Sequence, residues 1–502
     1  MDFNYTIPQL VYMLLALPPV FSIIAAVNVL GKGLLHWLNR LTSVAAGAIV
    51  VRLVMQFDPA APQAFGYLYL DALGLWMLVI VTMLYLAFAW TSKAYLDRDT
   101  NIRYGYLRRF GHLEGRFYAL SHLFVWTMML VVLVNNLGLM WVAIEATTLV
   151  SALLVAFKFT RTSLEAAWKY VMVCTVGICL ALLGTILVYY AQLGALGGDM
   201  PLDWAYLAEH GSELNPRLAK MAFCFLFVGY GTKIGLAPMH AWLPDTYSEA
   251  PSLTSAMLSG ALCTCVIYVL LRATIILMPA VGVDFIGTMS IFFGLLTIGI
   301  AIPFVVVQRD VKRMLAYSSM ENYGLMVAGF GLFIPMAVEA SLLHMMNHAF
   351  VKYILFYMAG TIVETYSTKN LMRIHGMIHQ APRTAMFWLL GIVGILGMPP
   401  MGVFFSEFYI LAGFFKANHP YLGILALVLL AGMLIGILYH AMRMLGGRPK
   451  RKAAGELMGR VDALAMLVLL LGSGIVSGFI HELPYLGELL TKAAGIVMGG
   501  AL

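Results

Sequence analysis

Apolar runs long enough to cross a lipid bilayer recur along the whole chain. One helical crossing of the hydrocarbon takes about 20 residues, and we count about fourteen such runs in the 502 residues. Only 11% of the residues are charged, which excludes an ordinary soluble protein, where about a quarter are charged. We therefore predict an all-α polytopic membrane protein with about fourteen transmembrane helices. No stretch is left over for a folded soluble domain.

The first run is expected to stay in the mature protein, because the residues before it are acidic rather than basic and do not form the start of a cleaved signal peptide. The expected spans lie at residues 8–31, 34–57, 72–92, 117–134, 137–158, 166–192, 219–244, 252–279, 284–307, 312–335, 336–365, 384–416, 421–446 and 461–480.

Basic residues are distributed unevenly between the two sets of connections. Lys and Arg gather in cytoplasmic loops, and most of the 31 in this chain fall in the odd-to-even connections. This bias predicts both termini on the outer face of a prokaryotic inner (plasma) membrane. It also accounts for the net charge of +7, so nothing indicates nucleic-acid binding. The most basic connections contain Arg103, Arg108 and Arg109, and Lys450, Arg451 and Lys452.

The five cysteines all fall inside expected spans, and no CxxC spacing occurs. We interpret them as packing residues rather than metal ligands or disulfides. No cofactor, iron-sulfur cluster, haem or metal site is therefore expected in this chain. The cysteines are Cys174, Cys179, Cys224, Cys263 and Cys265.

Two expected spans are interrupted by proline, the seventh at Pro238 and the twelfth at Pro399–Pro400. Corresponding breaks in two halves of a transporter indicate inverted repeats with a site between them. Because the breaks lie five spans apart, we predict two five-helix repeats of opposite orientation. The expected parts are an N-terminal three-helix segment at 1–116, a first repeat for proton uptake at 117–279, a second repeat for relay and exit at 284–446, and a C-terminal helix and tail at 461–502.

Four ionisable residues lie inside the spans: Glu145, Lys233, Lys352 and Glu407. A charge near the bilayer centre costs about 2.5–3.5 kcal/mol, so four unpaired charges would rival the stability of a typical fold, about 5–15 kcal/mol. They must be paired, hydrated or neutralised. One interpretation is a static Glu145–Lys233 ion pair. The interpretation that we favour is a proton-loading switch, since a buried ion pair often stabilises no more than apolar packing.

The eleventh span places His344, His348 and Lys352 at i, i+4 and i+8, on one helical face over about 12 Å. Histidine both accepts and donates a proton near neutral pH, which favours a proton relay over simple packing. Zinc binding is disfavoured, because no third ligand lies at a familiar spacing. His240, just after the first break, joins the candidate set. The polar run Ser318, Ser319, Glu321 and Asn322 predicts a wet path into the interior.

Four runs together resemble one family: GTKIGLAPMHAWLPDTYSEAPSLTSAMLSG, DVKRMLAYSS, HMMNHAFVKYILFYMAG and GMPPMGVFFSEF. They are similar to the antiporter-like membrane subunits of respiratory complex I, Mrp-type antiporters and energy-converting [NiFe] hydrogenases. The resemblance implies fourteen core helices, two inverted five-helix repeats and a hydrated polar axis. It also implies a coupling pair, a relay and an exit residue, which by motif match are Glu145 and Lys233, then His344, His348 and Lys352, then Glu407.

The chain departs from the family on the eighth span, where many relatives carry a lysine and this chain has Thr264. A hydroxyl holds a water but does not store a proton, so the usual central loading site is in doubt. A neutral residue here most resembles the F-type membrane protein of hydrogenase-4. The absence of a long lateral helix after the fourteenth span disfavours the distal subunit of either assembly.

The resemblance implies a proton-translocating membrane subunit of a redox-driven pump, either a membrane-bound hydrogenase of the hydrogenase-4 or formate hydrogenlyase type or an NADH-quinone oxidoreductase. Such a subunit has no redox centre of its own. Its partners would be other membrane subunits, the lipid bilayer, and soluble redox subunits carrying Fe-S clusters or a [NiFe] site. The transported ion would be H+, or Na+. The alternatives are a Mrp-type Na+/H+ antiporter subunit and a passive scaffold.

Overall fold

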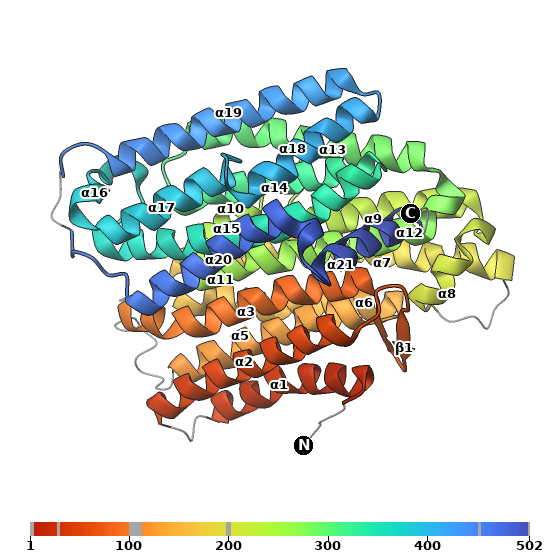
Figure 1. Cartoon of the computed structure of the whole chain (residues 1–502), viewed down its shortest axis with the longest axis horizontal. Coiled ribbons are helices and arrows are strands. Elements are labelled where there is room, and N and C mark those ends of the chain that lie inside the picture. Colours follow the sequence, from red (N-terminus) through yellow and green to blue (C-terminus); the bar gives the residue numbers. More distant parts are fainter. Residues whose placement is uncertain (1–4, 28–30, 100–112, 197–201, 450–452, 500–502) are drawn as a thin grey trace.

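The structure is a computed structural model that describes residues 5–27, 31–99, 113–196, 202–449 and 453–499. Figure 1 shows the long helices lying side by side and roughly parallel, with α1 at one edge and α19 at the opposite edge. Part of the predicted charge bias lies outside the described residues, namely Arg103, Arg108, Arg109, Lys450, Arg451 and Lys452.

The N-terminal part consists of α1 (Ile7–Val27), α2 (Lys32–Gln56) and α3 (Ala72–Arg98). Between α2 and α3, β1 (Gln63–Phe65) and β2 (Leu68–Leu70) form an antiparallel hairpin. The all-α expectation did not include this hairpin, because three-residue strands are too short to leave a clear alternating pattern. Leu70 is fully buried, so the hairpin packs against the end of the bundle.

The middle of the chain begins with α5 (Leu113–Leu133), α6 (Leu137–Val155) and α7 (Arg161–Leu196). The short α8 (Trp204–Glu209) precedes α9 (Pro216–Ile234), α10 (Leu243–Glu249) and α11 (Ser252–Met257). One π-helical turn, Leu258–Leu262, joins α11 to α12 (Cys263–Val281). Because α12 is buried almost throughout, it forms the centre of the bundle.

The later helices are α13 (Val283–Val306), α14 (Val311–Gly331), α15 (Pro335–Tyr366), α16 (Met377–Gln380), α17 (Pro382–Ile395), α18 (Gly402–Lys416) and α19 (Pro420–Leu445). The chain then forms α20 (Arg460–Phe479) and α21 (Leu486–Val497), which packs against α3 and α15. Short 3₁₀ turns occur at Ala156–Lys158, Gly211–Glu213, Leu371–Arg373 and Ile480–Glu482.

Ten helices of the described chain are long and apolar enough to cross a membrane. The other expected spans also fall on helices, namely α9, α14, α15 and the pair α17–α18. These are either interrupted or carry the buried polar residues, which lowers their hydropathy. The protein is therefore a multi-pass helical membrane protein.

Both expected breaks are present. The helix α9 ends at Ile234, where Gly235 adopts φ +91°, and α10 starts only at Leu243. The helix α17 ends at Ile395, and α18 starts at Gly402. In the first break a glycine supplies the left-handed conformation that other residues rarely adopt. The two interruptions place non-helical backbone inside the bundle, beside the ionisable residues.

Candidate functional site

Lys233 is fully buried on the last turn of α9 and points at α6. Its Nζ donates to the Ile144 carbonyl at 2.9 Å and to Thr147 Oγ1 at 2.9 Å, and it also bonds Thr148 Oγ1. These groups all lie on one turn of α6. We call Lys233, Glu145, Thr147, Thr148 and Thr175 the Lys233 cluster.

Glu145 lies beside Lys233 but forms no ion pair with it within the described residues. Thr148 links them, since its hydroxyl contacts the ammonium and donates to Glu145 Oε2 at 3.3 Å. Thr175 on α7 donates to the other carboxylate oxygen at 3.2 Å. Glu145 is half-buried, on the side of α6 where Val142 and Leu149 are exposed. Its carboxylate is therefore near the outer surface of the bundle.

Lys352 on α15 is also fully buried. Its Nζ donates to Ser318 Oγ at 2.8 Å and to the Leu315 carbonyl at 3.1 Å, both on α14. One turn further along α14, Glu321 is only 4% exposed. A buried lysine and a buried glutamate thus lie on adjacent turns of the same contact between α14 and α15.

Asn322 and His344 continue this polar region toward the second break. The Asn322 amide donates to Glu321 Oε2 at 2.7 Å, and its oxygen lies 3.0 Å from His344 Nε2. His344 Nδ1 lies 2.9 Å from Ser406 Oγ on α18. With Nε2 donating to the amide oxygen, Nδ1 accepts from the serine. We call Lys352, Ser318, Glu321, Asn322 and His344 the Lys352 cluster.

His348 is fully buried, and neither ring nitrogen has a hydrogen-bond partner among the described residues. Its ring packs edge-on against Tyr323, with centroids 5.1 Å apart. The predicted row of His344, His348 and Lys352 is on one helix, but direct hydrogen bonds do not join its members.

Glu407, on α18 after the second break, shares a cavity with Glu321. The cavity has a volume of about 300 Å³, and its other lining residues are mainly apolar side chains of α18 and α19. Gly397, at φ +57°, lies against the Glu407 carboxylate, and a Cβ there would clash with Oε2. Glycine at 397 thus suits the left-handed backbone and the close approach of the carboxylate.

Thr264 and His240 stand apart from both clusters. The Thr264 hydroxyl donates to the Gly260 and Ala261 carbonyls of its own helix, at 2.9 and 2.8 Å. His240 is half-buried in the first break, its ring lies 6.3 Å from Phe304, and its Nδ1 has no partner among the described residues. Neither residue hydrogen-bonds to a lysine in the described structure.

A third polar region, which we call the lysine cavity, lies where α10, α11, α14 and α15 meet. Its volume is about 300 Å³, and it is lined by Lys158, Lys312, Lys369, Glu249 and Glu364, among others. Lys312, 4% exposed, donates to the Ala250 carbonyl at 2.5 Å and to the Ser248 carbonyl at 3.1 Å. No carboxylate pairs with it among the described residues.

The other two lysines of this cavity are paired with acids. Lys369 lies 2.5 Å from Glu249 Oε1, and Lys158 lies 2.9 Å from Asp99 Oδ2. Glu249 lies in the connection between the seventh and eighth expected spans. Burial acts to raise its pKa, but hydrogen bonds from Lys369 and Thr162 outweigh burial and lower the pKa below its usual value. Glu249 is therefore a carboxylate at neutral pH. The cavity thus contains negative as well as positive charge and is not a simple binding site for anions.

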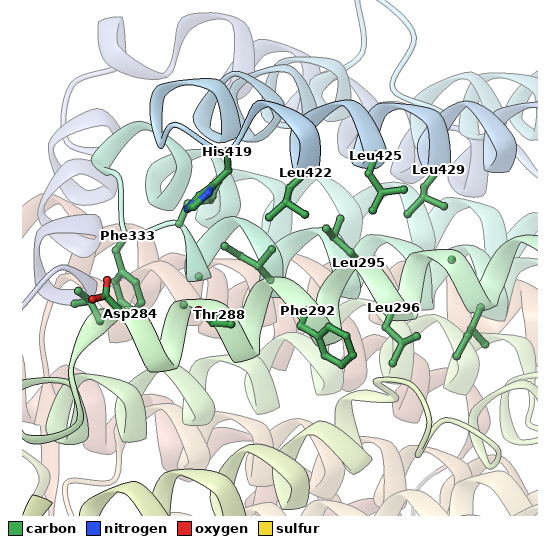
Figure 2. A pocket seen from close by; sticks show the side chains of 17 residues that line it. Asp284, Thr288, Phe292, Leu295, Leu296, Phe333, His419, Leu422, Leu425 and Leu429 are labelled. Atoms are coloured by element: carbon green, nitrogen blue, oxygen red, sulfur yellow. The ribbon is translucent and has the colours of Figure 1, made fainter.

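A larger cavity, about 840 Å³, lies between α13 and α19 (Figure 2). Leucine, isoleucine, valine and phenylalanine side chains cover most of its wall, and its polar residues are confined to the end that contains Asp284, Thr288 and His419. It contains no member of either lysine cluster. In this protein, therefore, the polar site does not lie in this larger cavity.

No group of three or more His, Cys, Asp or Glu side chains lies close enough together to hold a metal ion within the described ranges. All five cysteines are described, and none forms a disulfide. The ionisable residues are instead arranged as donors and acceptors of hydrogen bonds between helices.

Residues 134–434 match the family model described as NADH:quinone oxidoreductase/Mrp antiporter, TM. This match covers more than half of the chain and includes both lysine clusters and both breaks. The chain belongs to this family. The predicted family is confirmed, and the protein is an antiporter-like membrane subunit of the kind found in complex I, Mrp antiporters and membrane-bound hydrogenases.

One relative of this family member is the "Hydrogenase-4 component F homolog" of Methylacidiphilum infernorum, 33% identical over 84% of this chain and 86% of the relative. Two solved structures share the fold. A chain of the archaeal membrane-bound sulfane sulfur reductase has a TM-score of 0.82 at 21% identity, and a chain of the Mrp complex from Dietzia sp. DQ12-45-1b has 0.81 at 18% identity. Each match covers 97% of both chains.

Two residues of the site were not singled out from the sequence. Glu321 was predicted only as part of a polar path, although it lines the same cavity as Glu407. Lys312 is not among the candidate residues from the sequence, although it is buried. Lys312 lies at the start of α14, and Glu321, nine residues later, lies near its middle. This difference in position along the helix could have separated their roles.

Proposed function

We propose that this chain is the proton-translocating membrane subunit of a complex I-like, redox-driven pump of the membrane-bound hydrogenase type. The observation that carries the proposal is the full burial of Lys233 and Lys352, each bound to hydroxyl and carbonyl oxygens rather than to a carboxylate. A lysine kept only for stability would be expected to have a close counter-ion, because a lone buried charge is costly. Ionisable residues inside a membrane are rare and commonly mark ion or proton pathways.

The lysine cavity is the proposed site of proton uptake. It lies at the end of the bundle that the loop charges assign to the cytoplasm. From there protons load at Lys233, whose charge responds to the position of Glu145 through Thr148. They then reach Lys352 and pass through Glu321 to Glu407, the proposed exit. His344 hydrogen-bonds to Asn322 and Ser406, and Asn322 in turn donates to Glu321.

The hydrogenase assignment is supported by the relative named hydrogenase-4 component F homolog and by the neutral residue at 264. Electrons would then be handled by partner subunits that carry Fe-S clusters and a [NiFe] site. An NADH-quinone oxidoreductase is the neighbouring assignment within the same family. The half-buried carboxylate of Glu145, beside exposed apolar side chains of α6, suits contact with another membrane subunit.

A Mrp-type Na+/H+ antiporter subunit is the second candidate, favoured by the structural likeness to a chain of the Mrp complex. The proteins that bind this chain would distinguish the two candidate functions. Copurification with a tagged chain, followed by identification of the bound proteins, would yield hydrogenase large and small subunits in the first case. Small Mrp subunits and no redox protein would be recovered in the second.

Lys233→Ala in the assembled complex tests the proposed function. In proteoliposomes we expect redox turnover to move about tenfold fewer protons per electron pair, or none, because the buried proton acceptor is gone. Lys220→Ala is the matched control, since Lys220 is on the same helix but exposed. Unchanged stoichiometry in the Lys233 variant would contradict the proposal.

A further inference from the structure

Thr264 does not join the two lysine clusters, although its helix and the π-turn before it together contact both of their supporting elements. The helix α12 packs against α9, which carries Lys233, and the π-turn that precedes it packs against α15, which carries Lys352. The Thr264 hydroxyl is satisfied by carbonyls of its own helix, as is usual for threonine in a membrane helix. If one proton path runs through both clusters, other groups must carry it past α12. This requirement rests on the proposed function.

A buried network of five side chains occupies that position. Tyr247 OH lies 3.2 Å from Cys263 Sγ and 3.4 Å from Tyr323 OH. Tyr323 OH lies 3.2 Å from Ser259 Oγ, which lies 2.8 Å from Ser319 Oγ. All five side chains are fully buried. They come from α10, the π-turn, α12 and α14, so the contacts run between elements rather than along one helix.

The two ends of the network lie next to the two lysine clusters, at backbone carbonyls rather than at the ammonium groups themselves. At one end, Ser319 Oγ donates to the Leu315 carbonyl at 3.0 Å, and the same carbonyl accepts from Lys352 Nζ at 3.1 Å. At the other end, Cys263 Sγ lies 4.0 Å from the Lys233 carbonyl. Midway, the Tyr323 ring contacts His348, whose nitrogens are otherwise unpaired among the described residues.

The local backbone is shaped to support these contacts. Leu258–Leu262 forms a π-turn, a rare feature that is frequent at functional sites. The turn contains Ser259, whose carbonyl accepts from Tyr323 OH at 2.8 Å. Simple burial of the serine hydroxyls would not need this arrangement, since serine can bond to its own helix as Thr264 does.

We propose that Cys263, Tyr247, Tyr323, Ser259 and Ser319 carry protons between the Lys233 and Lys352 clusters in place of an ionisable residue at 264. Each hydroxyl or thiol accepts a proton on its lone pair and releases its own proton to the next group, so one bond to hydrogen forms as another breaks. No group is changed after the hydroxyls rotate back. A chain of this kind conducts H+ and offers no cage of oxygens for a metal cation.

Tyrosine-to-phenylalanine variants of the assembled complex test this proposal, because they remove one hydroxyl and keep the buried ring. With Tyr247→Phe or Tyr323→Phe we expect protons moved per electron pair to fall about tenfold in sodium-free proteoliposomes. Thr264→Val is the matched control and should leave that ratio unchanged. Ser319→Ala, which also keeps the packing, provides a further variant if a tyrosine variant does not assemble.

The outcomes separate this inference from the proposed function. Wild-type complex that moves no protons would contradict the proposed function itself. Wild-type transport that is lost in Lys233→Ala but unchanged in Tyr247→Phe, Tyr323→Phe and Ser319→Ala would overturn only the network. Loss in Thr264→Val with normal transport in the tyrosine variants would also overturn it.

Discussion

Lys233 and Lys352 are both fully buried ammonium groups held by oxygens of a neighbouring helix, but the carboxylates that accompany them differ. Glu145 is half-buried, close to exposed apolar side chains of α6, and Thr148 stands between it and Lys233. Glu321 is enclosed on α14 and shares a cavity with Glu407. The carboxylate of the first cluster therefore lies near the outer surface of the bundle, whereas that of the second faces only groups inside the bundle.

This difference predicts unequal effects when each carboxylate loses its charge. Glu321→Gln should lower proton transport about tenfold or more, because it removes the acceptor between Lys352 and Glu407. Glu145→Gln should lower it only a few-fold, because Thr148 and Thr175 still hold the amide beside Lys233. Proton release per electron pair in proteoliposomes measures both. A larger loss of proton transport in Glu145→Gln than in Glu321→Gln would contradict this expected difference between the clusters.

Gly397→Ala tests whether the second cluster needs its exit carboxylate in the broken segment. The new Cβ would clash with Glu407 Oε2, and the backbone there has φ +57°. We expect a several-fold loss of transport and a destabilisation of about 1–3 kcal/mol from the unfavourable backbone conformation. Gly478→Ala is the control, since nothing lies within 4 Å of a Cβ at that site. Equal transport by the two variants would show that transport tolerates displacement of the Glu407 carboxylate.

Substitutions of Lys312 test whether this residue takes up protons at the lysine cavity or only anchors the helices there. Arginine keeps the positive charge and the contacts to carbonyls but does not release a proton. If Lys312 takes up protons, Lys312→Arg and Lys312→Met should both lower transport about threefold to tenfold. An anchoring role alone would be restored by arginine. Lys169→Met, at an exposed lysine that contacts Asp245, serves as the control.

Asp71 and Arg272 provide the contrasting case of a buried charge with a tight partner. Both are 1% exposed, and two hydrogen bonds of 2.5 and 2.6 Å join them. Asp71→Asn should destabilise the fold by about 3–5 kcal/mol, because Arg272 is left buried without a counter-ion. Transport per assembled complex should be nearly unchanged. Thermal unfolding and transport measured on the same preparation separate the two effects.

The helices, both breaks and the family followed from the sequence because apolar length, proline position and ordered motifs are properties of the chain itself. The burial of Lys233 and Lys352 was expected for the same reason. The hydrogen-bond partners of the two lysines could not be predicted from the sequence. Whether Lys233 meets Glu145 or Thr147 depends on how α6 and α9 are rotated about their axes, which no single segment determines. The roles of Glu321 and of the Tyr247–Tyr323 contact likewise arise only when separate helices pack together.

The most direct test of the central claim is Lys352→Arg in the purified complex, reconstituted in sodium-free proteoliposomes and supplied with electrons through its redox subunits. Arginine retains the charge and the hydrogen-bonding capacity at Ser318 but does not give up a proton. We predict that the variant assembles and turns over electrons but moves few or no protons, while wild type acidifies one side of the membrane in an uncoupler-sensitive manner. Wild-type proton stoichiometry in the Lys352→Arg complex would contradict the account.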